Sequence, residues 1–222
     1  MLKIFYKYYG IQVRELWFLR HNQEERGCLK RVFQAQSAPR VAWKSRAKET
    51  LVIDLPLWDE SKIHKKTRYD IRRMSNDYAP PKIRLWSCLS AAEIHDVERS
   101  YNSFAQNKGV TKLNGRRLAA AASNVYYSAS QYRESMSFHI YLFDENRVRL
   151  LYSWTRISEG DKLASAGLNK SHTACDINFF KSAGFLLYDF GGFKKARMNG
   201  IDLFKSRFGG ESIIKHNFVR LF

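Results

Sequence analysis

Two runs of β-prone residues separated by a short polar turn constrain the fold of this chain more than any other feature. The first run, residues 136–143, reads MSFHIYLF, and the second, residues 147–154, reads RVRLLYSW. Asp144, Glu145 and Asn146 stand between them. Runs rich in Val, Ile, Tyr, Phe and Trp on either side of such a turn are typical of an antiparallel hairpin. We expect this hairpin to lie at the centre of the fold.

Upstream of the hairpin, strand and helix patterns alternate. Residues 50–55 read TLVIDL and end at Pro56, which predicts a strand entering a turn. A helix is expected over residues 58–74, because apolar positions recur there every three or four residues. The predicted buried face consists of Ile63, Thr67, Ile71 and Met74.

The pair Pro80 and Pro81 closes this helical region, and residues 82–89, KIRLWSCL, predict another strand. Ser90 is a typical helix cap, and the amphipathic helix that it starts buries Ile94, Val97, Tyr101 and Phe104. A further helix is expected after Asn114, through RRLAAAASNVYY, because alanine runs have high helix propensity.

Downstream of the hairpin we expect a loop containing Gly and Ser, a helix over about 171–183 and the strand FLLYDF at 185–190. A short helix to Phe208 and a last strand, SIIKHNFVRLF, complete the pattern. Strands that first pair as a meander and are then separated by helices indicate an α/β domain, in which helices flank a central mixed sheet. Residues 1–50 are a basic segment with one or two short elements, IFYKYY and VREL, and a loop over 34–40.

The formal net charge of +17 is the outstanding compositional feature. A positive field of this size attracts nucleic acid, nucleotide-linked substrates or an anionic membrane face, although a charged but otherwise ordinary surface remains an alternative. Cys28, Cys88 and Cys175 are too far apart for a metal motif, so we expect reduced thiols and no metal. No apolar run is long enough for a membrane span or a signal peptide, which favours the cytoplasm.

A candidate active site lies near the C-terminal end of the sequence. Asp189 ends an apolar strand, Gly191 and Gly192 allow a close backbone turn with free amides, and Lys205 follows on a short helix. A preorganised cation stabilises the tetrahedral oxyanion of acyl transfer, so Lys205 is the candidate for that role. Two alternatives remain open: Phe204 can form a core stripe with Phe208 while Lys205 points to water, and Asp189 can be a simple turn former.

A second candidate is the basic face of the helix expected over 58–74. Lys65, Arg68 and Arg72 follow the spacing i, i+3 and i+7, with Lys66 and Arg73 beside them. Such a stripe suits contacts to phosphates, which position a nucleic acid or a nucleotide. The alternative is a solvated helix face, partly neutralised by an ion pair between Lys66 and Asp70.

Three further residues are weaker candidates for substrate contact. His172 is expected near a helix N-terminus on the same side as Asp176, where it is a weak candidate for the general base that accepts a proton from an amine. A capping or packing role is the alternative for this histidine. Asn169 and Lys170 fall in the predicted loop before that helix, and their role as substrate ligands is implied by the family resemblance described next, in which they match a GxNK-like element.

The stretch from Tyr152 to Glu211 resembles the catalytic half of FemABX-type aminoacyl transferases of the GNAT superfamily. The resemblance is carried by the motifs YDFGG, FK and FGG, and by the basic helix HKKTRYDIRRM, which is similar to one that precedes the catalytic half in that family and in polysaccharide-cluster GNAT proteins. It implies a GNAT-like domain over 51–222, with residues 1–50 as part of the same domain. Lys205 would stabilise the oxyanion, Phe204 would lie against the acceptor end of tRNA, and Tyr188 would belong to the substrate site. Met74 departs from the small residue common there, and the chain is too short for two such domains.

The loop sequence RISEGDKLASAGLNK lacks the R/Q-x-x-G-x-G/A element with which acyl-CoA enzymes hold the pyrophosphate. This absence favours aminoacyl-tRNA as co-substrate over acyl-CoA, with no resident cofactor. The resemblance implies an amine acceptor on an anionic nucleotide- or lipid-linked envelope precursor, met in the cytoplasm or at the inner membrane face. A noncatalytic nucleic-acid-binding module and a docking subunit of a larger transferase remain as alternatives from other classes.

Overall fold

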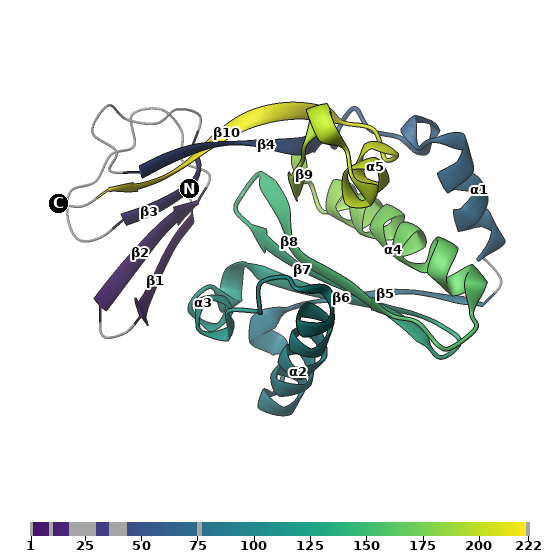
Figure 1. Cartoon of the computed structure of the whole chain (residues 1–222), viewed down its shortest axis with the longest axis horizontal. Helices are drawn as coiled ribbons and strands as arrows, with labels where there is room; N and C mark the ends of the chain where they lie inside the picture. The colour runs from purple at the N-terminus through teal and green to yellow at the C-terminus, as the bar shows by residue number, and fades with distance from the viewer. Residues whose placement is uncertain (1, 9–10, 18–29, 36–43, 75–76, 221–222) are drawn as a thin grey trace.

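The computed structural model describes residues 2–8, 11–17, 30–35, 44–74 and 77–220. Within these ranges ten strands form one mixed sheet in the order β1-β2-β3-β10-β4-β9-β8-β7-β6-β5 (Figure 1). The predicted fold class, an α/β domain whose central mixed sheet is flanked by helices, is confirmed. The strands are β1 Leu2–Tyr8, β2 Ile11–Trp17, β3 Lys30–Ala35, β4 Lys44–Asp54, β5 Tyr78–Leu85, β6 Val125–Tyr132, β7 Ser135–Phe143, β8 Arg147–Arg156, β9 Leu187–Gly192 and β10 Glu211–Arg220.

Helices cover both faces of this sheet. One face carries α2 and α3, and the other carries α1, α4 and α5 (Figure 1). The bounds are α1 Lys65–Arg73, α2 Ala91–Lys108, α3 Gly115–Ala120, α4 Lys162–Ser182 and α5 Gly200–Ser206. Ser90 caps α2 through a reciprocal capping box with Glu93, as the sequence predicts. In the described part of the chain, no helix is both long and apolar enough to span a bilayer.

The central hairpin of β7 and β8 is confirmed, with Phe143 opposite Val148 next to the turn. The strand on its other side, β6, is a correction, because residues 125–127 were expected to continue a helix. The helix instead stops at Ala120, and the β-branched and aromatic residues of VYY pair with β7. Tertiary pairing therefore overrides the helix propensity of the preceding alanines.

Helix α4 is longer than predicted and begins at Lys162 rather than near residue 171. The side chain of Asp161 caps it by accepting a hydrogen bond from the backbone N–H of Ala164. The Gly and Ser content that suggested a loop has a packing cause at Gly167, where an added Cβ would lie 2.3 Å from the sulfur of Met74. Gly167 lets α4 approach the end of α1 closely, so both Gly167 and the unusual Met74 are explained by one contact.

The helix expected over 58–74 is also shorter than predicted. Residues 60–62 form a single 3-10 turn, and α1 starts after His64, whose ring accepts from the backbone N–H of Lys66. Pro80 and Pro81 lie inside β5 instead of closing the helical region. They are tolerated because β5 is the edge strand of the sheet.

The N-terminal strands join the same sheet through β3, which pairs antiparallel with β10. The predicted elements IFYKYY and VREL correspond to β1 and β2, whereas β3 was not predicted. Glu15 on β2 is buried and forms a 2.7 Å ion pair with Arg117 of α3. Cys28 and residues 36–40 of the predicted loop lie outside the described residues.

The two strands that frame the candidate site separate soon after they begin. The parallel pairing of β8 with β9 covers only residues 147–149 and 187–189. A bulge in β8 follows between Leu150 and Tyr152, which pair with Tyr141 and Ile140 of β7. Beyond the paired residues the two strands diverge, and the end of β9 is therefore where the sheet opens.

Candidate active site

Asp189 is fixed at the point where β8 and β9 separate. Its carboxylate accepts hydrogen bonds from the Thr50 hydroxyl and from the backbone N–H of Gly191, and it forms a 2.8 Å ion pair with Arg149. Burial alone would raise the pKa of Asp189, but the charges of Arg149 and Arg147 and these hydrogen bonds hold it below its ordinary value. The carboxylate is completely buried, where it holds the Thr50 hydroxyl, the Gly191 N–H and the Arg149 guanidinium in place.

Lys205 reaches the end of β9 from α5. Its ammonium donates a hydrogen bond to the backbone carbonyl of Gly192. The side chain is half-buried, and burial lowers the pKa of this lysine, with the charge of Arg149 acting in the same direction. Lys205 is thus held at the sheet opening rather than extended into water.

Phe204 combines the two roles that the sequence left open. Its ring packs edge-on against Phe208 with centroids 5.2 Å apart, and Phe208 is completely buried. Phe204 itself stays half-exposed beside Lys205. Phe204 and Phe208 therefore do pack together, as the alternative predicted, and this packing fixes α5. Lys205 nevertheless does not point to water, because its ammonium reaches the Gly192 carbonyl of β9.

The glycine pair gives the end of β9 its open shape. Gly191 has a φ of +78°, and an added Cβ would come within 3.3 Å of the Leu150 carbonyl oxygen. Gly192 is exposed, and no atom lies within 4 Å of the position that a Cβ would take. The backbone can therefore turn closely past β8 and leave free space next to the Lys205 ammonium.

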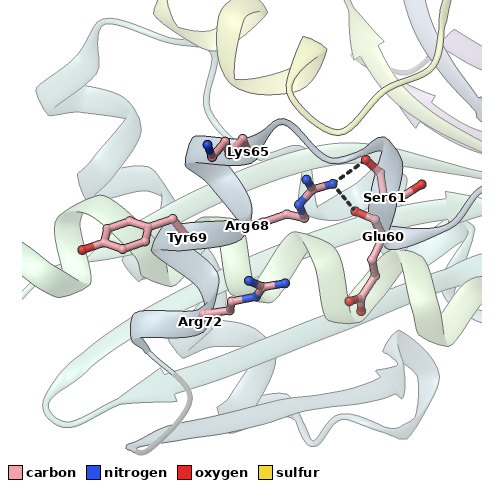
Figure 2. A pocket seen from close by; sticks show the side chains of 6 residues that line it. All are labelled: Glu60, Ser61, Lys65, Arg68, Tyr69 and Arg72. Carbon is pink, nitrogen blue, oxygen red and sulfur yellow. Dashed lines mark hydrogen bonds between the residues drawn. The ribbon is translucent and has the colours of Figure 1, made fainter.

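The basic face of α1 lines a separate pocket of about 530 Å³ (Figure 2). Arg68 and Arg72 point toward residues Glu60 and Ser61 of the 3-10 turn, and the Arg68 guanidinium donates to the backbone carbonyls of both. Lys65 projects from the same helix, while the exposed ring of Tyr69 points away from the turn. The sequence-predicted cations Lys65, Arg68 and Arg72 are therefore brought together.

Two other predicted ligands of this region have structural partners. Arg73 lies over the ring of Tyr69, 5.6 Å from its centroid. Lys170 forms a 2.6 Å ion pair with Asp70, both largely buried, and so ties α4 to α1. The predicted loop position of Lys170 is wrong, because the residue lies within α4, whereas its contact with substrate stays a prediction.

A buried polar network lies under α4 on the face of the sheet opposite the Asp189 side chain. The carboxylate of Asp176 accepts hydrogen bonds from Ser128 at 2.8 Å and from Tyr141 at 2.6 Å, and the His139 ring lies 2.7 Å away. The other nitrogen of His139 faces the side-chain oxygen of Asn169 at 2.8 Å. Asn169 is half-buried, so it is the outermost member of this network.

His172 and Tyr188 are corrections to the predicted site. His172 lies in the middle of α4, completely buried, and stacks on His139 with ring centroids 3.8 Å apart. Burial, followed by the neighbouring His139, lowers the pKa of His172 to about 3. A neutral ring without solvent access does not reach an attacking amine. Tyr188 is equally buried and points at Tyr141, 3.1 Å between the hydroxyl oxygens, so it supports the core and not a substrate.

The side chains of His139, His172 and Asp176 form a group whose potential metal-ligand atoms lie within 4.8 Å of one another. Sequence spacing missed this group because its members come from β7 and α4. The two imidazole rings are nearly parallel, with an interplanar angle of 9°. Ring lone pairs lie in the ring planes, so nearly parallel stacked rings do not converge on one ion, and every ligand atom is already hydrogen-bonded. The geometry fits a hydrogen-bond network better than a metal site.

Solved structures share this fold at low sequence identity. The C-terminal domain of a protein described as a lysylphosphatidylglycerol synthetase from Agrobacterium fabrum aligns with a TM-score of 0.57, 12% identity, and coverage of 87% of this chain and 68% of that chain. L-PGS from Bacillus licheniformis aligns with a TM-score of 0.55 and 11% identity, and the alignment covers 97% of this chain and 79% of that chain. FemX aligns with a TM-score of 0.54 and 10% identity, and the alignment covers 78% of this chain and 61% of that chain. No family profile and no curated protein matches the sequence. The FemX-like fold implied by the sequence motifs is therefore confirmed, at identities that speak for the fold alone.

Proposed function

We propose that this chain is an acyltransferase of the GNAT superfamily, which moves an aminoacyl group from aminoacyl-tRNA to an amine of a cell-envelope or glycan precursor. The observation that carries the proposal is the position of the Lys205 ammonium, at the open end of β9 beside the Arg149 and Asp189 pair. The similarity in fold to FemX and to L-PGS supports the same class of reaction.

The chemistry follows from the position of this cation. The acceptor amine attacks the carbonyl carbon of the aminoacyl ester, and the carbonyl oxygen becomes an oxyanion. The Lys205 ammonium stabilises that charge in a half-buried site, where an electrostatic contact is stronger than in water. Collapse of the intermediate breaks the ester bond, and the proton lost by the amine ends on the departing ribose hydroxyl.

Asp189 has a supporting role in this scheme. Its negative charge, fixed by Thr50 and Gly191, keeps Arg149 in place and opposes the effect of burial on Lys205. Arg149 in turn adds positive potential at the site. Both side chains are thus positioning residues, and Lys205 is the group that meets the reacting oxygen.

The basic pocket at α1 is suited to the phosphates of the donor. Lys65, Arg68 and Arg72 present three cations around one cavity, and the net charge of +17 extends this attraction over the molecule. Phe204, which is half-exposed beside Lys205, is the residue that we propose lies against the acceptor end of tRNA. Such a reaction belongs in the cytoplasm or at the inner face of the membrane, where charged tRNA is present.

The alternative is an acyl-CoA-dependent N-acyltransferase acting on an amino sugar or polysaccharide precursor. It uses the same lysine and the same oxyanion, so only the donor distinguishes it. A parallel titration with aminoacylated tRNA and with acetyl-CoA, at low and moderate salt, separates the two.

Tight binding of aminoacylated tRNA that is lost on deacylation is the expected result. Saturable binding of acetyl-CoA with indifferent binding of tRNA would replace the aminoacyl donor by acyl-CoA. Binding of neither donor would overturn both forms of the proposal and would favour a docking protein. Tight tRNA binding that is insensitive to aminoacylation, without any transfer of the aminoacyl group, would instead indicate a noncatalytic nucleic-acid module.

A further inference from the structure

A second cavity, of about 570 Å³, lies on the sheet face opposite α4 and is formed by strands and by the loop after β4. Its volume falls in the ordinary range for small-molecule sites. Much of its wall is apolar and aliphatic, with one buried indole. The apolar residues that line it include Val52, Leu57, Trp58, Leu187 and Ile213.

Two buried cations line the same cavity. Arg147 and Lys215 come from β8 and β10, which are separated by β9 and β4, and only 8% and 9% of their surfaces are exposed. In the described part of the chain, no carboxylate lies within ion-pair distance of the Lys215 ammonium. Burial, followed by the charge of Arg147, lowers the pKa of Lys215. The buried Asp189 carboxylate acts on both cations, and a second anion between them would offset more of the free energy that burying two like charges costs.

The acidic groups of this cavity are at its rim. Asp54 and Glu211 are exposed, as is the third cation, Lys62. Solvent screens charges in such positions, and the Asp54 carboxylate also accepts a hydrogen bond from the backbone N–H of Leu57. The interior therefore stays positive while the rim is mixed.

We propose that this cavity binds an amphipathic anion, with its acidic headgroup between Arg147 and Lys215 and its aliphatic chain against the apolar wall. Aliphatic lining favours a hydrocarbon chain over a nucleobase, since Trp58 is only 1% exposed and presents no open ring face. Leu57 is 68% exposed and continues the apolar surface outward from the cavity. A hydrocarbon chain longer than the cavity would need such a surface.

The position of the cavity connects it with the candidate active site. The Asp189 carboxylate acts electrostatically on both Lys205 and Lys215. An anionic acceptor held here would be coupled by charge, through Asp189, to the lysine proposed to hold the oxyanion. Only this last step rests on the proposed transfer reaction, whereas binding of the anion is tested without turnover.

The test is a calorimetric titration of the wild-type chain with ethyl, hexyl and decyl phosphate below their micellar concentrations. We expect affinity to rise roughly three- to fourfold for each methylene that becomes buried. A comparison of decanoate with decyl phosphate shows whether the site prefers a carboxylate or a phosphate headgroup. Binding of either compound supports the proposal. Equal affinity for ethyl and decyl phosphate, or tighter binding of inorganic phosphate or adenosine monophosphate than of hexyl phosphate, would overturn it.

Lys215 provides the matched variants. Lys215→Met keeps the length of the side chain and removes its charge, so decyl phosphate should bind at least about tenfold more weakly. The ligand-free Lys215→Met protein should also melt at a higher temperature, because a buried charge has been removed. Lys215→Arg should retain binding. Unchanged affinity in Lys215→Met would refute the headgroup site. Lys205→Ala should bind decyl phosphate normally, so failure of transfer and failure of binding are separable.

Discussion

The two faces of the central sheet bury polar groups in opposite ways. Under α4, the Asp176 carboxylate is surrounded by matched donors from Ser128, His139 and Tyr141. On the other face, the charges of Arg147, Arg149 and Lys215 act on Asp189, and Lys205 of α5 acts on the same carboxylate from the end of β9. The α4 network is closed within the protein, whereas the opposite face holds more positive charge than its buried carboxylate neutralises.

This difference in how buried polar groups are paired distinguishes residues that stabilise the fold from residues that bind a ligand. A buried group whose hydrogen bonds are all made by other protein groups specifies packing, and its removal costs stability. Buried cations without enough internal counter-charge reduce stability, and they are retained where a ligand completes them. We therefore expect variants of the α4 network to lower the free energy of unfolding, and variants of the cationic residues around Asp189 to change binding and turnover.

The largest expected effect is on the α4 face, in Asp176→Ala. The substitution removes the buried carboxylate shared by His139, Tyr141 and Ser128, and it should lower the free energy of unfolding by about 3–5 kcal/mol. Urea denaturation followed by circular dichroism measures this loss. Asp96→Ala, at an exposed ion pair with Arg99, is the control and should change little. A loss in Asp176→Ala as small as that of the control would show that the network does not hold the fold.

Lys205→Ala should have the converse result. Turnover should fall about 10²- to 10³-fold, the magnitude found when one oxyanion donor is removed. The melting temperature should change little, because alanine is well accepted in a short helix. Lys194→Ala is a matched control, since Lys194 is an exposed lysine close in sequence. A folded Lys205→Ala enzyme with normal turnover would eliminate the mechanism.

The pH dependence of the reaction tests the same lysine. Burial lowers the pKa of Lys205 below its ordinary value, so the catalytic ammonium is lost as pH rises through that lowered value. Turnover should then decrease about tenfold per pH unit, at a lower pH than for an ordinary lysine. Stability should change in the other direction. In this window the unfolded chain binds more protons than the folded one, so the Lys205 contribution to the free energy of unfolding increases with pH. A rate that falls only together with stability would point to unfolding instead.

On the surface, the basic pocket of α1 predicts a smaller, salt-dependent effect. The double variant Lys65→Glu and Arg72→Glu should weaken tRNA binding, and each lost phosphate contact should reduce the slope of log K against log salt by about one. The wild-type sensitivity between about 50 and 200 mM salt should shrink roughly tenfold. The double variant Lys112→Glu and Arg116→Glu, at two exposed sites beyond α2, gives the same change in net charge as a control. Equal effects in both proteins would mean that the pocket acts only through net charge.

Local sequence signals were sufficient for the parts of the site that lie close together along the chain. The hairpin of β7 and β8, the strand β9 and the short helix with Lys205 all follow from patterns within about ten residues. Turn chemistry at Gly191 and Gly192 likewise identified the end of β9. These elements confirm the expected fold and place Lys205 beside the sheet opening.

The remaining parts depend on contacts between distant residues, which no local pattern contains. The start of α4 was missed because Gly167 is needed for close packing against Met74 at the end of α1, a contact that the local sequence does not reveal. The partners of Asp189 were missed for the same reason, since Thr50 and Arg149 come from β4 and β8. His172 and Asp176 were correctly placed on one side of a helix, but spacing alone did not reveal that this side is completely buried.

The smallest expected effect distinguishes packing from substrate contact at Tyr188. Tyr188→Phe removes one hydroxyl, which lies 3.1 Å from the Tyr141 hydroxyl in a completely buried environment. The free energy of unfolding should fall by only about 0.5–1.5 kcal/mol, the net value of one hydrogen bond. KM for both substrates should stay unchanged, because the side chain has no route to solvent. Tyr141→Phe is the partner variant, and it should cost more because its hydroxyl also donates to Asp176. An increase in KM for Tyr188→Phe at constant stability would return this tyrosine to the substrate site and would show that the α4 face is not closed.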